Sequence, residues 1–437
     1  MAEVPTQSPP LSTPDLPINE SVHAIYQEPT RSLSWTYRIL FGLCCLVTGM
    51  VQITVKQVLL SNQVSLFDPI HHIATFAIIG TLGGIAGVLI SPLAGAISDR
   101  TTSRWGRRRP WIIFGLCLGT MGLVLMANSY SFWPLLIGEI IVQIAFDTIM
   151  SATTAIIPDQ IPTNQRATVS AFVGMSPVIG GLLGVILVAR FSNPAVDPTR
   201  GYLVLLITAI IVVVPFFLVL REERLPHEAV PSFNWKTFST RFIVSPRKHP
   251  DFFYTWISRC LIFLAYIMMN AFLLFYLRDA VHYANPTAGV AIFNLLAGIL
   301  VVISAIVSGI IAKKTGRIKI FVISGALVMM VAMIMLALVH SWPVSMAAAL
   351  VLGLGFGTYL SIDMVLAVRV LPEATERAKD LGLMNIAIFL PLVLSQIIGG
   401  AILTAIPGAF GYTVFLAIAA AFLLGAALLI IPIKSVR

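Results

Sequence analysis

Apolar residues are gathered into twelve stretches that polar segments separate. Each stretch is close to the roughly 20 residues that an α-helix needs to cross a lipid bilayer. We predict helices rather than barrel strands, because the stretches are too long and alternate too weakly between apolar and polar positions. The predicted spans are residues 37–59, 73–97, 111–129, 133–157, 168–190, 202–220, 252–277, 288–311, 319–339, 343–368, 382–404 and 412–433.

The longest polar segment lies between the sixth and seventh spans and is rich in charges and prolines. The sequence therefore predicts an all-α membrane protein whose twelve transmembrane helices form two six-helix bundles, related as pseudo-repeats. The expected parts are a disordered tail at 1–35, an N-terminal bundle at 36–220, a linker at 221–251, a C-terminal bundle at 252–433 and a short tail at 434–437.

The two halves repeat each other at two matching places. The loop after span 2, GAISDRTTSRWGRRRP (95–110), has a shorter counterpart after span 8, GIIAKKTGRIKI (309–320). In span 4, Asp147 is followed by a Pro-Asp pair near the end of the span. In span 10, Asp363 is followed by a Pro-Glu pair at a similar spacing. Internal repeats of this kind are typical of secondary transporters, whose substrate sites lie between the repeats.

Composition and charge support a membrane location. Of the 437 residues, 58% are hydrophobic and 11% are charged, against roughly 25% charged in soluble domains. The net charge is +9, but the basic residues gather in alternate polar segments, as the positive-inside rule requires, which argues against nucleic acid as a partner. We expect cytoplasmic N- and C-termini and a monomeric, multi-pass protein of the cell (inner or plasma) membrane, surrounded by the lipid bilayer.

The sequence contains none of the motifs that would indicate a membrane enzyme. It has no cluster of His, Cys and Asp with metal-ligand spacing, no glycine-rich phosphate loop with a lysine, and no nucleophile elbow. Its four cysteines all fall in apolar spans. We therefore expect no catalytic residues, no metal and no cofactor, apart from a coupling proton.

Polar residues are concentrated in spans 1, 4, 7 and 10, whereas spans 3, 6, 9 and 12 hold no acidic or basic residue away from their ends. In spans 1, 4 and 10 the polar residues recur every four positions and so share one helix face, which is expected to line the interior of the bundle. The candidate residues for solute binding or coupling are Gln52, Lys56, Glu139, Gln143, Asp147, Arg259, Asn270, Tyr359 and Asp363.

Each of these assignments has a structural alternative. Lys56 and Arg259 lie near enough to span ends to extend their charged groups to the interface, and Glu139 could be a solvated residue of the rim. Asp147 and Asp363 lie deeper, where a charge costs on the order of 2.5–3.5 kcal/mol. For these two, substrate or proton binding is weighed against structural ion pairing.

The loop between spans 2 and 3 carries a family resemblance. The residues that match the loop signature of the major facilitator superfamily are Gly95, Asp99, Arg100, Gly106, Arg107 and Arg108. The fuller segment SDRTTSRWGRRRP is similar to that of sucrose transporters and of the related glycoside–pentoside–hexuronide cation symporters. The resemblance implies a conformational gate, in which Asp99 would meet the loop arginines and the N-terminal end of helix 11.

The sequence also departs from these relatives. Thr154 stands where sucrose carriers have an arginine, and span 2 lacks the acidic residues of melibiose-type sodium symporters, which favours protons over sodium as the coupling ion. The segment SPVIGG (176–181) resembles an element of proton-coupled drug antiporters.

Together these features give a leading hypothesis and an alternative. The leading hypothesis is a secondary active transporter that moves a small polar solute, a sugar or glycoside, by proton-coupled symport with alternating access. The alternative is a proton-coupled efflux antiporter for drugs or amphipathic metabolites.

Overall fold

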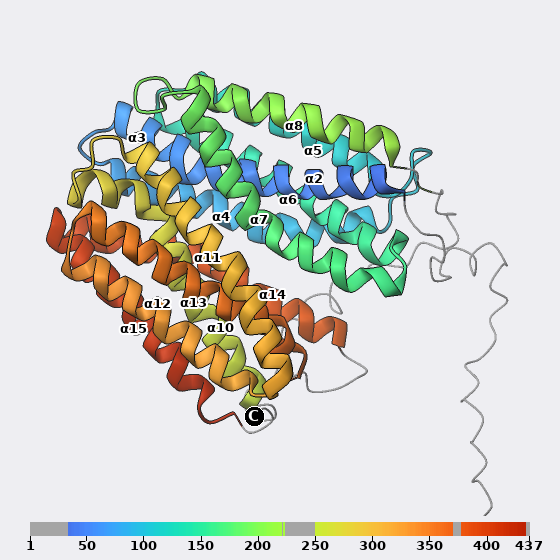
Figure 1. Cartoon of the computed structure of the whole chain (residues 1–437). Coiled ribbons are helices and arrows are strands. Elements are labelled where there is room, and N and C mark those ends of the chain that lie inside the picture. The colour runs from blue at the N-terminus through green and yellow to red at the C-terminus, as the bar shows by residue number, and fades with distance from the viewer. Residues whose placement is uncertain (1–33, 221, 223–249, 370–376, 434–437) are drawn as a thin grey trace, which may run out of the picture.

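The computed structural model describes residues 34–220, 222, 250–369 and 377–433. Within these residues, twelve helices are long and apolar enough to cross a membrane, which confirms the predicted all-helical, twelve-span fold (Figure 1). Nearly all of the expected tail at 1–35 and of the linker at 221–251, and the tail at 434–437, lie outside the described residues. The cytoplasmic location of the termini stays a prediction.

The first half of the chain forms six spans. They are α2 (Trp35–Thr54) continued by η1 (Val55–Leu60) and α3 (Ser61–Phe67), α4 (His72–Ser98), α5 (Arg109–Ala127), α6 (Phe132–Gln160), α7 (Thr163–Phe191) and α8 (Thr199–Val219).

The second half forms the other six. They are α10 (Pro250–Phe275) continued by η3 (Tyr276–Ala280), α11 (Pro286–Thr315), α12 (Ile318–Leu338), α13 (Trp342–Arg369), α14 (Arg377–Ala405) and α15 (Ala409–Ile430).

The first span of each half is longer than predicted. Span 1 reaches from Trp35 to Phe67 rather than from 37 to 59, because the polar residues that follow the apolar stretch, residues 61–63, are buried inside the bundle. Both first spans contain a π-helical stretch near their second end, η1 in span 1 and η3 in span 7. Such stretches are rare in α-helices and occur frequently at functional sites. Here they lie at corresponding places in the two halves.

Glycines let helices within each half approach closely. A Cβ atom on Gly180 of α7 would lie 2.1 Å from the carbonyl oxygen of Leu46 in α2. In the second half, a Cβ atom on Gly353 of α13 would lie 2.2 Å from the carbonyl oxygen of Ala297 in α11. Larger residues would force these backbones apart, so the glycine-rich segment of span 5 serves helix packing.

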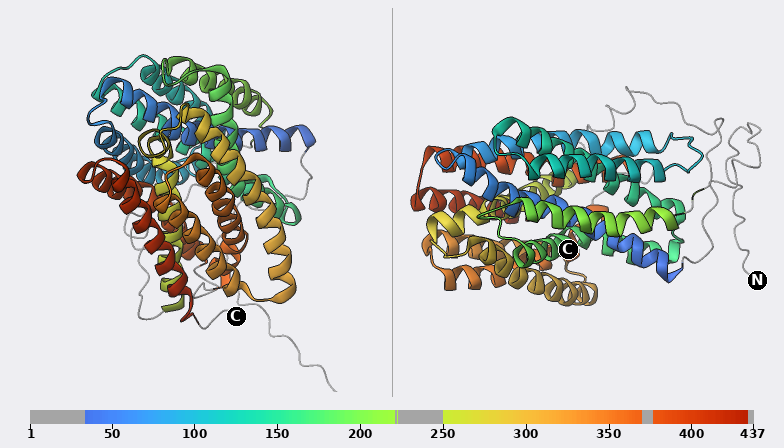
Figure 2. Two further views of the ribbon diagram at one scale, coloured as in Figure 1. Left: turned by 60° about the vertical axis from the view of Figure 1, so that its left-hand side comes forward. Right: turned by 90° about the horizontal axis from the view of Figure 1, so that it is seen from above.

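The two halves lie side by side. Among the described residues, the most extensive contacts between them are those of α4 with α14, α7 with α11, and η1 with α10. We call the end where α2 begins and α15 ends the termini end, and the end that carries α3 and η3 the far end. Figures 1 and 2 show the blue-to-green and yellow-to-red helices close together at the far end and diverging toward the termini end.

Direct contacts between the halves close the far end. The ring of Phe76 in α4 packs edge-to-face against Phe272 and Phe275 of α10, with centroids 5.5 and 5.1 Å apart. The Arg278 guanidinium of η3 donates a hydrogen bond from Nη1 to Ser65 Oγ of α3 at 2.5 Å. The closed far end and the diverging termini end fix the direction from which the space between the halves is reached.

Candidate functional site

A cavity of about 300 Å³ lies between the two halves. Its lining residues come from α2 with η1, α4, α6, α7, α10, α11, α13 and α14, and none of them comes from α5, α8, α12 or α15. The volume is at the lower end of the range for small-molecule sites. The polar residues of the lining are Gln52, Lys56, Gln57, Gln143, Asp147, Tyr266, Asn270, Asn294 and Gln396.

A chain of hydrogen bonds runs along the N-terminal wall of this cavity. Lys56 Nζ donates to Gln143 Oε1 at 2.6 Å, and Gln143 Nε2 donates to Asp147 Oδ2 at 2.6 Å. Gln52 Nε2 donates to the other carboxylate oxygen of Asp147 at 2.6 Å, and Lys56 Nζ lies 3.5 Å from Glu139 Oε1. The structure thus brings together the five candidates of spans 1 and 4, with Lys56 paired with Glu139 and linked to Asp147 through Gln143.

Helical spacing and two glycines position the carboxylates. Glu139 and Asp147 are eight residues apart in α6 and therefore lie on one face of that helix. The facing helix α4 leaves room for them: a Cβ atom on Gly83 would lie 2.8 Å from Glu139 Cγ, and one on Gly87 would lie 2.5 Å from Asp147 Oδ2. No side chain larger than hydrogen fits at these two positions without displacing an acid.

The charges of this wall do not balance. With both carboxyls ionised, Glu139 and Asp147 outnumber Lys56 by one negative charge, which one bound proton would remove. Glu139 is only 1% exposed, and its Oε2 has no hydrogen-bond partner among the described residues. Because a buried, unpaired charge costs several kcal/mol, the site is suited to taking up a proton or a cationic group.

Amide side chains continue the polar lining across to the C-terminal half. Gln57 Nε2 donates to the carbonyl oxygen of Asn270 at 3.2 Å, and Asn294 Nδ2 donates to Gln57 Oε1 at 2.8 Å. On α14, Gln396 Oε1 has no hydrogen-bond partner among the described residues. The sequence predicted Asn270 but not the other three. Gln57 lies in span 1 but outside its four-residue spacing, and Asn294 and Gln396 lie in spans 8 and 11, which were not among the polar spans. The signal available for Asn294 and Gln396 was an isolated amide in an apolar span.

Apolar and aromatic residues form the rest of the wall. Tyr266 of α10 lines the cavity and stacks on Phe356 of α13, with ring centroids 3.7 Å apart and planes at 7°. Phe293 of α11 and Phe389 of α14 are also part of the lining. The cavity therefore offers flat apolar surfaces opposite a wall of amides and charges.

The structure places the remaining candidates, Arg259, Tyr359 and Asp363, away from the cavity lining. Arg259 Nη2 lies 3.1 Å from Asp363 Oδ2, and Tyr359 OH donates to Asp363 Oδ1 at 2.6 Å. The side chains of Arg259 and Asp363 are 3% and 9% exposed, so the pair is enclosed between α10 and α13. Arg259 Nε and Nη1 have no hydrogen-bond partner among the described residues.

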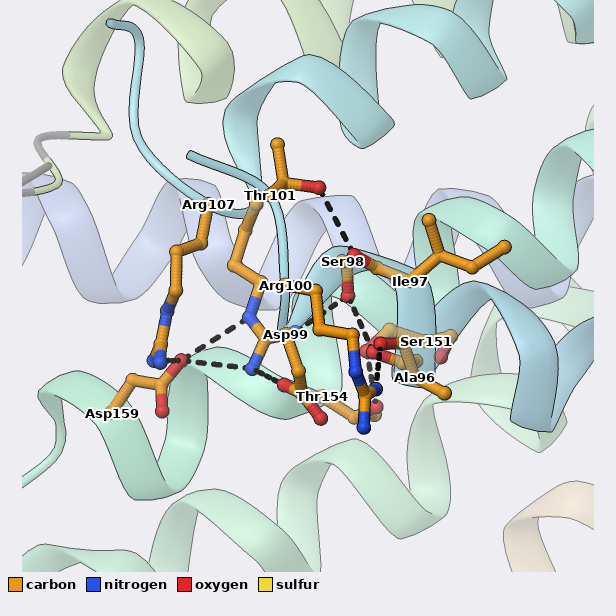
Figure 3. A network of polar contacts seen from close by, with 12 residues as sticks. Ala96, Ile97, Ser98, Asp99, Arg100, Thr101, Arg107, Ser151, Thr154 and Asp159 are labelled. Atoms are coloured by element: carbon orange, nitrogen blue, oxygen red, sulfur yellow. Dashed lines mark hydrogen bonds and ion pairs between the residues drawn. The ribbon is translucent and has the colours of Figure 1, made fainter. Parts of the chain in front are cut away.

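The loop residues proposed as a conformational gate gather at the termini end, between α4 and α6. Arg108 Nη2 lies 2.5 Å from Asp99 Oδ1 and 3.1 Å from Asp159 Oδ2, and Arg107 Nη2 lies 2.6 Å from the same Asp159 oxygen. Figure 3 shows Arg107 directed toward Asp159, with Asp99 nearby in the same network of polar contacts. The predicted contact of Asp99 with the N-terminal end of helix 11 involves side chains that lie outside the described residues.

The other three gate residues shape the loop around this cluster. Arg100 donates from Nη1 to the carbonyl oxygen of Ala96 at 2.5 Å, and a Cβ atom on Gly95 would lie 3.1 Å from Ser151 Oγ of α6. Gly106 has φ of +101°, a conformation that favours glycine.

Glu222 holds this loop from beyond the end of α8. Its Oε2 accepts hydrogen bonds from the backbone N–H groups of Arg108 and Arg109, at 2.7 and 3.0 Å, and so caps the start of α5. Burial raises the pKa of the Glu222 carboxyl, and these two hydrogen bonds oppose that shift. Sequence reasoning missed both Glu222 and Asp159 as members of the cluster, although it had singled out the Pro-Asp pair that contains Asp159.

Comparison with known proteins identifies the family. Residues 39–390 match the model of the Major Facilitator Superfamily. The chain belongs to the major facilitator superfamily. This confirms the resemblance inferred from the loop between spans 2 and 3.

Sugar transporters are among the curated relatives of this superfamily member. A general alpha-glucoside permease of Schizosaccharomyces pombe is 31% identical over 127 residues, which are 25% of this chain and 23% of the permease. The sucrose transport protein SUC3 of Arabidopsis thaliana is 28% identical over 172 residues, 32% of this chain and 29% of that protein. The matched segments thus span less than a third of each relative's length.

Solved structures share the fold over nearly the whole chain. The nucleoside transporter NupG has a TM-score of 0.69 and 15% identity, with 91% of this chain and 98% of that chain covered. A bacterial homologue of the human lysosomal transporter Spinster, in an inward-facing and unoccupied conformation, has a TM-score of 0.68 and 16% identity, with 92% and 99% covered.

Proposed function

We propose that the protein is a secondary active transporter that moves a sugar or glycoside by proton-coupled symport. The observation that carries the proposal is the cavity between the halves, in which amides of both halves face a lysine that pairs with Glu139 and is linked to Asp147 through Gln143. Alternating access by rocking of the halves would expose this cavity to each side in turn.

The lining supports a hydroxylated solute. Gln52, Gln57, Asn270, Asn294 and Gln396 provide amide donors and acceptors, which suit the mixed donor and acceptor character of hydroxyl groups. Tyr266, Phe293 and Phe389 add aromatic surfaces on which the apolar face of a pyranose ring or an aglycone can pack.

The carboxylates support proton coupling. Asp147 lines the cavity and receives hydrogen bonds from Gln52 and Gln143, so its protonation would weaken both hydrogen bonds and make the amides available to a solute. Glu139 lies eight residues earlier on the same helix face and contacts Lys56, which also donates to Gln143 of the network. A proton would neutralise the excess negative charge of this wall during passage through the membrane.

The gate cluster supports a change of conformation at the termini end. Asp99, Arg108 and Asp159 join the ends of α4 and α6 with the loop that leads into α5. Such a cluster would stabilise the arrangement of this end in one state and rearrange in the other.

A pH measurement with a panel of sugars tests the proposed function as a whole. Purified protein in lightly buffered proteoliposomes would be exposed to external mono- and disaccharides and to glycosides while external pH is recorded. External alkalinisation with one solute, absent in Asp147→Asn vesicles, is the expected result. Alkalinisation that is equally large in Asp147→Asn vesicles would show that Asp147 does not carry the coupled proton. If no solute changed the external pH, proton-coupled sugar symport would be excluded.

The second candidate is proton-coupled efflux of an amphipathic compound. The apolar part of the lining favours it, including Pro177 and Gly181 of the SPVIGG segment. Extrusion of a lipophilic dye from inside-loaded vesicles, together with a silent sugar panel, would select this function. In either case we propose a monomer of the inner or plasma membrane that acts without a catalytic residue, metal or cofactor.

A further inference from the structure

The far end holds a histidine that neither the cavity nor the gate cluster uses. His72 is the first residue of α4, and its ring lies where the two halves meet. Its Nε2 lies 3.4 Å from Asp279 Oδ2 of η3, in the other half, and its Nδ1 lies 2.9 Å from the carbonyl oxygen of Pro69. The side chains of His72 and Asp279 are 18% and 24% exposed, so water reaches the contact only in part.

Both ring nitrogens of His72 therefore face acceptors. A backbone carbonyl and an ionised carboxylate accept hydrogen bonds but donate none. A neutral imidazole carries one N–H and can satisfy only one of the two, whereas an imidazolium carries two. The geometry around His72 thus matches the protonated ring.

The groups around Asp279 keep it an acceptor. Arg278 Nε lies 2.7 Å from Asp279 Oδ1, and Tyr412 OH of α15 donates to Oδ2 at 3.0 Å. With His72, three donors therefore converge on one carboxylate, which is the arrangement expected for an anion. The Phe275 ring, with its centroid 5.4 Å from that of His72, adds no charge.

The charged groups on the His72 side form a separate pair. Asp68 Oδ2 accepts a hydrogen bond from Thr75 Oγ1 at 2.7 Å, which is the largest cause lowering the pKa of Asp68. Asp68 Oδ1 lies 3.5 Å from Nδ1 of the neighbouring His71, whose side chain is 72% exposed. His71 therefore pairs within its own half, whereas His72 reaches across to the other half.

We propose that His72 is a proton-binding site that holds the far end closed, with its imidazolium joining α4 of one half to η3 of the other through Asp279. Opening the far end would separate the two residues. A proton on His72 would therefore stabilise the closed state, and loss of that proton would remove the stabilisation. The inference concerns the conformational equilibrium and holds for any solute and any role of Asp147.

The direct test measures how far apart the halves are at the far end. Spin labels would be attached at Ala195→Cys and Val339→Cys, which lie in exposed far-end loops of the two halves, in a chain that also carries Cys117→Ser and Cys260→Ser. Pulsed electron resonance in lipid nanodiscs would give the populations of short and long distances from about pH 5.5 to about pH 8.5. We expect the closed-to-open ratio to fall by about fivefold over this range, as for one partly exposed ion pair.

Variants distinguish the contribution of His72 to the pH response from that of neighbouring residues. His72→Gln and Asp279→Asn should each leave a closed-to-open ratio that no longer changes with pH. His71→Gln is the matched control and should keep the full response. A response in His72→Gln as large as in the labelled parent, or an unresponsive parent, would overturn the proposal.

A second measurement needs no conformational change. The protein without spin labels would be enriched in nitrogen-15 histidine and studied by NMR. The ring signals of His72, assigned by their absence in His72→Gln, should show two protonated nitrogens at about pH 6. At the same pH, the signals of the doubly protonated ring should be weaker in Asp279→Asn than in the parent. A His72 ring with one unprotonated nitrogen at about pH 6 would contradict the proposed site, whatever the distances show.

Discussion

The two halves repeat each other in fold, yet they place their buried charges differently. In the N-terminal half, Lys56 and Asp147 face the cavity, and Glu139 adjoins them. In the C-terminal half, Arg259 and Asp363 pair with each other away from the cavity lining. Both arrangements satisfy the requirement that a charge in a bilayer be paired or face the interior.

The comparison shows that intramembrane aspartates at matching positions of the two repeats, Asp147 and Asp363, need not have the same role. A carboxylate that lines a cavity can meet a solute or a proton without unpacking the bundle. A carboxylate enclosed against an arginine and a tyrosine is first of all a partner that neutralises a buried cation. The following variants test this division, from the largest expected effect to the smallest.

Asp147→Asn should abolish coupled accumulation of the solute. The amide keeps the size of the side chain but cannot carry a proton, so the network of Gln52 and Gln143 loses its anion. Uptake driven by a pH gradient in proteoliposomes should fall to that of protein-free vesicles, while solute exchange without a gradient persists. Gradient-driven accumulation at the parent level would contradict the role of the N-terminal wall.

Asp363→Asn should mainly reduce stability. It leaves Arg259 buried without an anion, which typically costs about 3–5 kcal/mol, and Arg259 already has two nitrogens without a partner among the described residues. Thermal unfolding in detergent, followed by tryptophan fluorescence, measures the loss. The double variant Arg259→Met with Asp363→Leu should recover most of it, and a double variant as unstable as Asp363→Asn would argue against simple pairing.

Gly87→Ala should reduce transport by about tenfold, because the new methyl group would displace the Asp147 carboxylate or Gln143, at a cost of about 1–3 kcal/mol. Initial uptake rates measure the effect. Gly298→Ala is the matched control from the C-terminal half: it lines the same cavity, but its Cβ atom would lie 3.2 Å from the flexible end of Leu182. Equal losses in both variants would mean that cavity volume, not the carboxylate, is decisive.

Asn294→Ala should weaken solute binding without affecting coupling. It removes the hydrogen bond to Gln57 and one amide from the lining, and a hydrogen bond contributes about 0.5–1.5 kcal/mol, which corresponds to a KM about twofold to twelvefold higher. Concentration-dependent uptake and the proton-to-solute ratio are the two measurements. Thr208→Val on α8, away from the cavity lining, should change neither quantity, and a changed proton ratio in Asn294→Ala would count against its assignment to the solute side.

Glu222→Gln should have the smallest effect, on how stability changes with pH. Because burial raises the pKa of Glu222, the folded protein binds this proton more tightly than the unfolded chain does, so stability is lost as pH rises through the raised pKa. The amide keeps an oxygen for the N–H groups of Arg108 and Arg109 and has no charge to bury. The difference in unfolding temperature between about pH 4.5 and about pH 7 should shrink, and an unchanged difference would assign the pH dependence elsewhere.

The fold was accessible from sequence because hydropathy and helix length are local properties. Twelve apolar stretches predicted twelve spans, and only the polar residues buried at the end of span 1 concealed its full length. The stripes of spans 1 and 4 also predicted which residues share a face. The contacts across the two halves were not predictable: Gln57 of η1 and Asn294 of α11 meet through packing between the halves, which no local pattern encodes.

The candidates of the C-terminal half show what residue spacing cannot predict. Tyr359 and Asp363 do share a face of α13, as their spacing predicts, and they are hydrogen-bonded to each other. Periodicity gives the face but not the neighbour, so it could not distinguish a face turned toward the cavity from one turned toward Arg259.

The π-helical stretch η1 has a consequence for how this sequence is aligned with others. A π turn holds more residues than an α turn, so the helix beyond it is out of phase with the helix before it. Each α-helical residue turns the chain by about 100°, and deleting one residue from Val55–Leu60 to restore α-helix would rotate the segment Ser61–Phe67 by that angle. Ser65 would then no longer face Arg278. A single-residue gap at this place in an alignment therefore marks a different orientation of the far-end contacts, even where every flanking residue is identical.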